Sequence, residues 1–150
     1  MRFWHSGLVA VAVGMSGNIS GQDGVLGTTA GTGAEGSSGD GGLATAATFV
    51  LPMAVITRAT DGSQFVADAA ANVVRRIDSS GVITTFCGQS GEAGYSGDGG
   101  PAGQALLSAP YDLAVDSAGN LFIAEAGNNV VRKVAATTGT ITTFAGTGVA

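Results

Sequence analysis

Two aspartates, Asp40 and Asp98, each lie in the sequence Ser-Gly-Asp-Gly-Gly. The flanking glycines permit positive φ and leave backbone amides accessible, so the carboxylate could bind calcium or a polar group of a ligand. Alternatively, each carboxylate accepts hydrogen bonds from the amides of its own turn. A catalytic site is normally built once, and this motif occurs twice, which favours the structural role. We therefore predict no metal site and no cofactor, with Asp40 and Asp98 the metal candidates if one exists.

A second set of polar residues also occurs twice. Asp68 and Glu125 each end an apolar run, and Asn72 and Asn129 follow them by four residues. Carboxylates and carboxamides at such positions cap loop amides. We predict that these four residues stabilise turns.

Few residues could form a catalytic set. Asp112 and Asp116 flank an apolar run in the second half of the chain and could form a carboxylate pair, but the first half has no counterpart. The single histidine, His5, lies outside the repeated region, so neither a Ser-His-Asp set nor a zinc site can be assembled from that region. The single cysteine, Cys87, takes the place of Ala145 in the other copy, which predicts a buried, unreactive thiol. No catalytic residue is predicted.

These residues belong to a long internal repeat. Three stretches recur in order at a spacing of 57 or 58 residues: Ser38–Pro52 as Ser96–Pro110, Phe65–Ile77 as Phe122–Val134, and Gly81–Gly88 as Gly139–Gly146. A repeat of this length indicates stacked supersecondary units that bury their apolar faces against each other.

Each unit contains four short runs rich in Val, Ile, Thr and Phe, separated by Gly, Asn, Asp and Ser. In the second unit these runs are Tyr111–Asp116, Leu121–Ala124, Val130–Val134 and Thr140–Ala145. Runs of this kind predict a four-stranded antiparallel meander, and repeated meanders are typical of a β-propeller. The predicted fold is all-β: a partial propeller of two blades plus one extra outer strand.

The linker between the units, Gly88–Pro110, is longer than the path from the rim of one blade to the inner strand of the next. We therefore expect it to fold on itself, with one or two helical turns after Pro101. Pro52 and Pro110 then favour extended backbone at the start of each inner strand.

The N-terminal segment carries further traces of the pattern. Residues 24–33 align with Gly139–Gly148 and are predicted to form the outer strand of a preceding blade. Residues 1–23 are either a signal peptide, with an apolar core at Gly7–Met15, or a decayed inner strand. The predicted organisation is then completed by blade 1 with its linker over 34–88 and blade 2 with its linker over 89–150.

The repeat resembles a known family. Pro110–Val134 resembles the NHL repeat, which has a proline, an apolar strand with Asp, Gly-Asn, a strand ending in Ala-Asp, then Asn and Ile-Arg-Lys-Val. The linker Gly94–Ala102, together with Ile141–Gly148, resembles the long-repeat variety found in secreted or surface proteins. The resemblance covers residues 24–150 and implies an extracellular or cell-surface location.

The first copy departs from the NHL pattern, because Arg58 replaces the aspartate seen at Asp116 and Leu43 replaces Pro101. Family resemblance implies a propeller but not one activity, since NHL propellers include binding modules, RNA binders and a few lyases or hydrolases. Zinc-dependent members need several histidines, and this chain has only His5.

Charge restricts the partners. The formal net charge is −5, which argues against binding a phosphate backbone. Four of the six basic residues form two dipeptides, Arg75-Arg76 and Arg132-Lys133, interpreted as solvated strand edges paired with nearby carboxylates. No apolar run is long enough to span a bilayer.

The sequence thus favours a non-catalytic scaffold that binds a protein or glycan surface. The alternative is a fragment of a propeller lyase or hydrolase whose catalytic residues lie in further blades. Because propellers close with about four to eight blades, two blades leave an apolar face at each end. We expect self-association or further blades to complete the ring.

Overall fold

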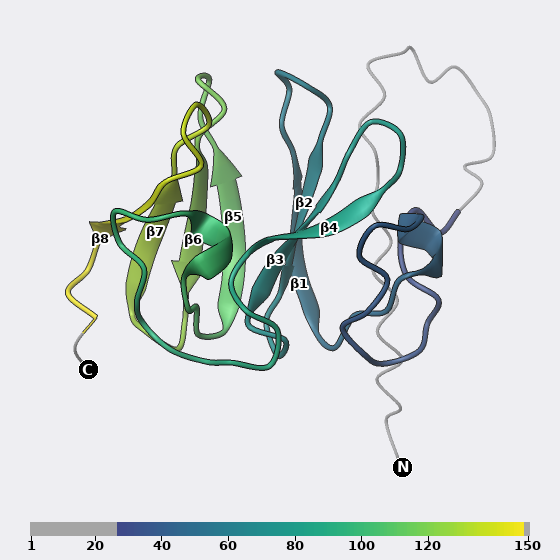
Figure 1. Ribbon diagram of the computed structural model, residues 1–150, viewed down its shortest axis with the longest axis horizontal. Helices are drawn as coiled ribbons and strands as arrows, with labels where there is room; N and C mark the ends of the chain where they lie inside the picture. The colour runs from purple at the N-terminus through teal and green to yellow at the C-terminus, as the bar shows by residue number, and fades with distance from the viewer. Residues whose placement is uncertain (1–26, 149–150) are drawn as a thin grey trace, which may run out of the picture.

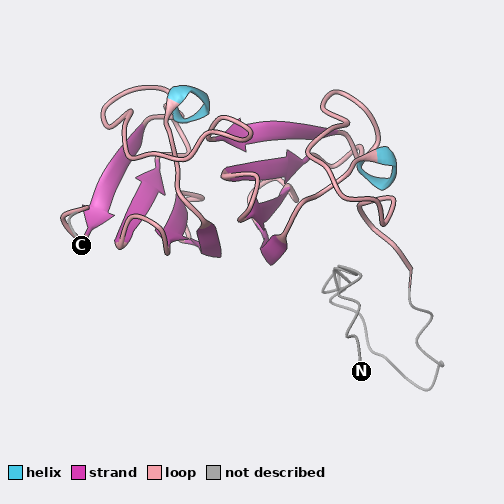
Figure 2. Cartoon of the chain, turned by 90° about the horizontal axis from the view of Figure 1, so that it is seen from below, coloured by secondary structure: helices cyan, strands magenta, loops and turns pink. Residues whose placement is uncertain are grey.

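The structure, a computed structural model, describes residues 27–148 and is built almost entirely from β-strands. Two four-stranded antiparallel sheets follow each other along the chain, each with its strands in sequence order. Figures 1 and 2 show the two sheets side by side as separate fans. Blade 1 contains β1 (Pro52–Thr57), β2 (Gln64–Asp68), β3 (Val73–Ile77) and β4 (Ile83–Cys87); blade 2 contains β5 (Pro110–Val115), β6 (Leu121–Glu125), β7 (Val130–Val134) and β8 (Ile141–Ala145). The predicted two-blade partial propeller is confirmed.

The two blades repeat each other down to their irregularities. In each, the register shifts once near the start of the first strand, after Pro52 and after Pro110. A second shift separates Val74 from Arg75 and Val131 from Arg132 in the pairing of the third and fourth strands. Such bulges bend a strand and increase its twist, so the same bulge in both copies gives both blades the same shape.

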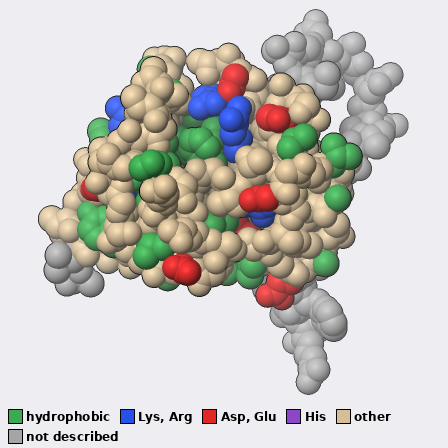
Figure 3. All heavy atoms as spheres, in the orientation of Figure 1, with side chains coloured by type: hydrophobic (Ala, Val, Ile, Leu, Met, Phe, Trp, Pro, Cys, Tyr) green, Lys and Arg blue, Asp and Glu red, His purple; other side chains and the backbone are tan. Residues whose placement is uncertain are grey.

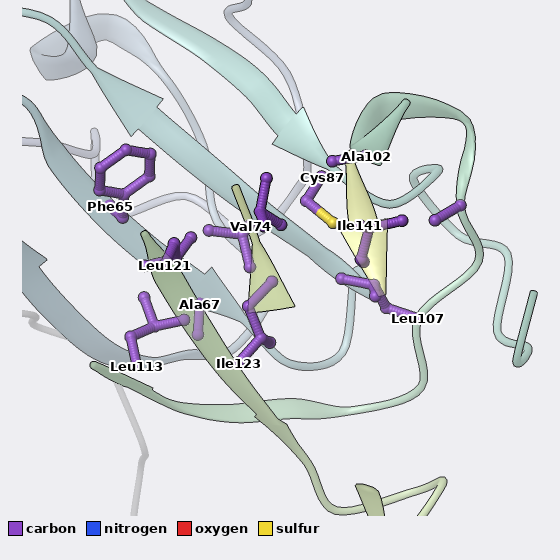
Figure 4. Close-up of a cluster of buried hydrophobic side chains, with 12 residues drawn as sticks. Phe65, Ala67, Val74, Cys87, Ala102, Leu107, Leu113, Leu121, Ile123 and Ile141 are labelled. Carbon is purple, nitrogen blue, oxygen red and sulfur yellow. The ribbon is translucent and has the colours of Figure 1, made fainter. Parts of the chain in front are cut away.

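The blades pack through their first strands. The first strands of the two blades, β1 and β5, are neighbours, and β2 also contacts β5. The main core lies between the blades, where alternate residues of blade 1 meet those of blade 2 (Figure 4). Its fully buried members include Phe65, Val74, Leu107, Ile123 and Ile141. Because side chains alternate along a strand, each sheet has a second face that points away from this core.

The second face of blade 1 is covered by its own linker. Val66, Ile77 and Ile83 form a smaller core with Ala44 and Ala47, and all five are buried. The expectation of an exposed apolar face at each end is therefore wrong at the blade 1 end. The linker of a repeat packs across its own blade, which the repeat pattern alone does not reveal.

The linkers fold as compact loops with one tight helical turn each. These turns are the 3₁₀ helices η1 (Ala44–Ala46) and η2 (Ala102–Gln104). Pro101 is extended and directly precedes η2. The expected one or two helical turns are thus a single 3₁₀ turn, and η2 lies against β4 of the preceding blade.

The expected outer strand over 24–33 is not formed in its described part. Residues 27–33 adopt bends, although Gly31 donates its N–H to Ala44 O at 2.8 Å as Gly88 does to Ala102 O in the next repeat. An outer strand needs the third strand of its own blade as hydrogen-bond partner. Residues 1–23, interpreted as a signal peptide or decayed strand, lie outside the described residues. Within residues 27–148 no helix is long and apolar enough to cross a membrane.

Candidate functional site

The repeated aspartates bind two buried arginines. Arg132, on β7, is fully buried and donates from Nη2 to Asp98 Oδ1 at 2.6 Å and to Ser96 O at 3.0 Å. Arg75, on β3, makes the equivalent contacts, with Asp40 Oδ1 at 2.5 Å and Ser38 O at 3.2 Å. In both repeats the third strand holds the linker of its own blade.

The second carboxylate oxygen is also used. Thr85 N–H donates to Asp40 Oδ2 and Thr143 N–H to Asp98 Oδ2, each at 2.9 Å. Asp40 and Asp98 thus have a structural role, as predicted, but their partners differ from the expected ones. Each carboxylate binds a strand arginine and a strand amide instead of amides of its own turn. Partial burial disfavours ionisation of Asp98, but hydrogen bonds from Thr143 and the Arg132 guanidinium hold its pKa below the usual value. The pKa of Asp40 is lowered in the same way.

The interpretation of both basic dipeptides as solvated strand edges is wrong for one residue of each. Arg75 and Arg132 are 1% and 0% exposed, whereas Arg76 and Lys133 are only partly buried. Successive side chains of a strand point to opposite faces, so a dipeptide places one residue under the linker and the other outside. The predicted pairing with carboxylates holds for Arg75 and Arg132.

Asp68 and Glu125 bind loop amides, as predicted. Asp68 accepts from Val50 N–H and Leu51 N–H, and Glu125 Oε2 accepts from Ser108 N–H at 2.8 Å. The longer Glu125 side chain also reaches Arg132, with Oε1 3.2 Å from Nη1. Burial raises the pKa of Glu125, although its hydrogen bonds and the guanidinium oppose that rise. Arg132 therefore has two carboxylate partners, whereas Arg75 has one among the described residues.

Asn72 and Asn129 lie in the turns that follow the second strands. Both have positive φ, 58° and 55°, a conformation that asparagine tolerates better than most residues. Asn72 also joins the blades, because its Oδ1 accepts from Ala109 N–H at 2.9 Å.

Asp112 and Asp116 do not form a carboxylate pair. Asp112 lies near the start of β5 and Asp116 just past its end, so about 13 Å of extended chain separates them. Asp116 accepts from Ala118 N–H and Asn120 N–H of its own turn, and its pKa is lowered chiefly by the hydrogen bonds from Asn120. Asp116 thus stabilises a turn.

Cys87 lies in the core between the blades and is fully buried. Burial raises the pKa of its thiol to about 12. The predicted buried, unreactive cysteine is confirmed as to its burial, and its thiolate is strongly disfavoured at neutral pH.

Acidic side chains are dispersed over the described region. Within residues 27–148 no three or more His, Cys, Asp or Glu side chains are grouped to hold a metal ion. On the face shown in Figure 3, basic side chains lie beside acidic ones instead of forming a broad basic patch. Arg58 and Arg76, for example, both pair with Asp61.

Exposed aromatic side chains are another potential binding feature. Tyr95 is engaged internally: its ring lies 5.1 Å from the Arg132 guanidinium, and its hydroxyl is 2.7 Å from Thr143 Oγ1. Tyr111 and Phe144 are more exposed, at 55% and 63%. Sequence reasoning missed both because they lie within strands, at positions whose exposure depends on which faces are covered.

A groove of about 430 Å³ opens on the face of blade 2 that points away from blade 1. We call it the blade 2 groove. Apolar residues dominate its lining, with Glu125 and Asn129 as polar members; the other lining residues are Tyr111, Ala124, Ala126, Val130, Val131, Ala145 and Gly146. It is a candidate binding site because it combines an apolar floor with the carboxamide of Asn129.

Comparison with solved structures finds a similar fold in another protein. A protein of unknown function from Bacteroides thetaiotaomicron has a crystal structure that matches 74% of this chain with a TM-score of 0.65 and 27% identity. The chain shares its fold. It spans only 27% of the length of that protein. No family model and no curated protein matches the chain.

Proposed function

We propose that the chain is a non-catalytic NHL-type propeller segment that serves as a binding scaffold for a protein or glycan surface. One observation carries the proposal: the repeated acidic residues are used by the fold itself. Asp40 and Asp98 hold buried arginines, and Asp68 and Glu125 hold loop amides. These carboxylates are committed to structure, and the same commitment occurs in both repeats, as expected for architecture.

Two features support a macromolecular partner. The turn at Ala126–Asn128 and the loop at Glu92–Tyr95 lie together, because Asn128 Nδ2 donates to Gly94 O at 2.7 Å. Small residues and polar groups on a joined surface suit hydrogen bonding to a large partner, and loops on a rigid scaffold commonly carry binding residues. The proposal includes an extracellular or cell-surface location, supported by the resemblance of Gly94–Ala102 to linkers of secreted proteins.

The test is to immobilise the chain and measure binding to arrayed glycans and to purified surface proteins. Glu92→Arg, in the exposed loop, should weaken a bound partner at least tenfold. Thr137→Arg is the matched control, because it lies in the turn between β7 and β8, at the opposite end of the strands. In parallel, the chain is assayed with lactone, ester and peptide-amide substrates. Turnover that disappears in Asp112→Asn or Asp116→Asn would overturn the proposal.

A further inference from the structure

Both buried arginines of the fold are bound by an aromatic ring and an aspartate. The Arg132 guanidinium lies 5.1 Å from the centre of the Tyr95 ring and donates to Asp98 Oδ1 at 2.6 Å. The Arg75 guanidinium has a ring and an aspartate as partners in the same way. The ring face attracts the cation, and the carboxylate accepts its N–H groups. A ring beside an aspartate is therefore the means by which this chain binds a guanidinium.

Tyr111 and Asp112 provide the same two groups without a cation. Within residues 27–148, every aromatic ring except that of Tyr111 lies against a cation or another ring. Asp112 Oδ1 accepts from the N–H of the next residue, Leu113, and its Oδ2 has no hydrogen-bond partner among the described residues. The fold thus leaves a ring and a carboxylate without partners at two consecutive positions.

A β-bulge exposes both side chains. Along a regular strand, successive side chains point to opposite faces. In β5 the register shifts between Pro110 and Asp112, which leaves Tyr111 without a residue opposite it on β6. Tyr111 and Asp112 are consequently both exposed, between the buried Pro110 and Leu113. Bulges re-aim side chains in this way and are frequent next to functional sites.

The positions of this pair remain accessible beside a packed blade. Their equivalents in blade 1 are Met53 and Ala54, and blade 2 packs beside them because β1 and β5 are neighbours. Met53 is nevertheless 39% exposed, and Ala54 is only half-buried. The site is therefore separate from the contact between blades. Because Met53 and Ala54 carry neither a ring nor a charge, blade 1 lacks this site.

We infer that Tyr111 and Asp112 bind an arginine side chain of a partner protein, with the guanidinium over the ring and hydrogen-bonded to the carboxylate. This rests on the proposed function, since it names the chemistry of a protein partner of the scaffold. The arginine comes from outside the described residues, because each arginine within residues 27–148 already pairs with an aspartate. The formal net charge of −5 favours approach of a basic partner.

The surroundings of the pair specify the partner further. Leu51, just before β1, and Met53, on β1, are 49% and 39% exposed, and β1 is next to β5. An arginine with apolar neighbours in its own segment therefore fits this surface. Arginine fits better than lysine, because a planar guanidinium can stack on a ring and donate to a carboxylate at the same time.

The test is an NMR titration of the complete, isotope-labelled chain with the peptide acetyl-Ala-Leu-Arg-Leu-Ala-amide. We expect saturable shifts of the Tyr111, Asp112 and Leu113 amide signals. Affinity should fall about threefold when citrulline, which keeps the shape but not the charge, replaces the arginine. Asp112→Asn and Tyr111→Leu in the chain should each weaken binding by a similar factor.

Two matched variants control for general effects of charge and aromatic area. Glu35→Gln removes the same charge from an exposed position in the linker of blade 1. Phe144→Leu removes a ring that is 63% exposed on β8. Both variants should bind the peptide as the unaltered chain does.

The inference is wrong if tens of millimolar peptide cause no saturable shifts, if the citrulline peptide binds equally well, or if Asp112→Asn and Tyr111→Leu behave like the two controls. Self-association of the chain that Asp112→Asn abolishes would also overturn it, because the arginine would then belong to a second copy. The scaffold proposal is tested separately through Glu92→Arg. Glycan or protein binding that depends on Glu92, in a chain that does not bind the arginine peptide, refutes this inference alone.

Discussion

Arg132 and Asp98 lie 34 residues apart and are joined by a hydrogen bond of 2.6 Å between Nη2 and Oδ1. One repeat earlier, Arg75 and Asp40 make the same contact at 2.5 Å. Each guanidinium is buried beneath the linker that supplies its aspartate. The aspartate of the Ser-Gly-Asp-Gly-Gly motif therefore attaches each linker to the third strand of its own blade through an arginine.

The Arg75–Asp40 and Arg132–Asp98 contacts should differ in their contribution to the free energy of unfolding. Arg75 has Asp40 as its carboxylate partner, whereas Arg132 keeps Glu125 if Asp98 is changed. A buried charge without a carboxylate is costly, so Asp40→Asn should lower the free energy of unfolding by about 1–3 kcal/mol, and Asp98→Asn by less. Urea denaturation of the two variants measures the difference. Equal losses would show that Glu125 does not compensate.

Calcium should have no effect on stability. Both oxygens of Asp40 and of Asp98 already accept hydrogen bonds from an arginine and a threonine amide. A cation would have to displace these donors. The melting temperature should be the same with calcium in millimolar excess and with a chelator. A saturable rise that Asp98→Asn removes would make the repeated turn a metal site.

Acid should remove the contribution of Asp98. Partial burial disfavours its ionisation, but the hydrogen bonds from Thr143 and Arg132 outweigh burial and hold its folded pKa below the usual value. A carboxyl with a lowered folded pKa stabilises the fold above its unfolded pKa, and this contribution is lost as the pH falls through the folded value. The stability advantage of the unaltered chain over Asp98→Asn should thus be constant near neutrality and shrink below about pH 4.

An advantage that is the same at pH 7 and pH 2.5 would contradict this linkage. The measurement is the urea midpoint of both proteins across that range. Asp112→Asn is a suitable control, because Asp112 is exposed and, within residues 27–148, bonds only to the neighbouring Leu113 amide. Its difference from the unaltered chain should not follow the curve of Asp98→Asn.

The strands could be predicted closely from the sequence because alternation and turn residues agree in both copies. The predicted run Val130–Val134 is β7 itself, and Thr140–Ala145 differs from β8 by one residue. The burial of Arg132 had a signal too: it falls between Val130 and Val134 on the same side of the strand. Its positive charge favours exposure to solvent, and in Arg132 the buried carboxylate of Glu125 and the linker aspartate Asp98 offset that preference.

The site was less predictable because it depends on what covers each face. Val74 and Val131 occupy equivalent positions, yet only Val74 is fully buried. No property of the two sequences separates them, since Val74 is covered by blade 2 and its linker, whereas Val131 lines the open groove. The groove on blade 2 is likewise a property of the assembly of elements, and only the structure reveals it.

Cys87 should resist modification in the folded chain. The thiol is fully buried and its pKa is raised to about 12 by burial, so the thiolate is scarce at neutral pH. A thiol reagent should label it only in denaturant. Cys87→Ala should keep the fold, because Ala145 occupies the equivalent place in blade 2. Rapid labelling of the native chain at pH 7 would contradict the buried position.

Gly88 should tolerate substitution much less than Gly81. Both have positive φ, 89° and 83°, so alanine at either position carries a similar backbone strain of about 1–2 kcal/mol. The two glycines differ in the room available for a side chain. A Cβ at Gly88 would lie 2.3 Å from Asn72 O, whereas a Cβ at Gly81 would have no atom within 4 Å. Gly88→Ala must move the Asn72 turn, and with it the bond from Ala109 that joins the blades. Urea denaturation should show a clearly larger loss for Gly88→Ala than for Gly81→Ala. Equal losses would mean that strain alone accounts for both, and that the contact between Gly88 and the Asn72 turn can relax without weakening the joint between the blades.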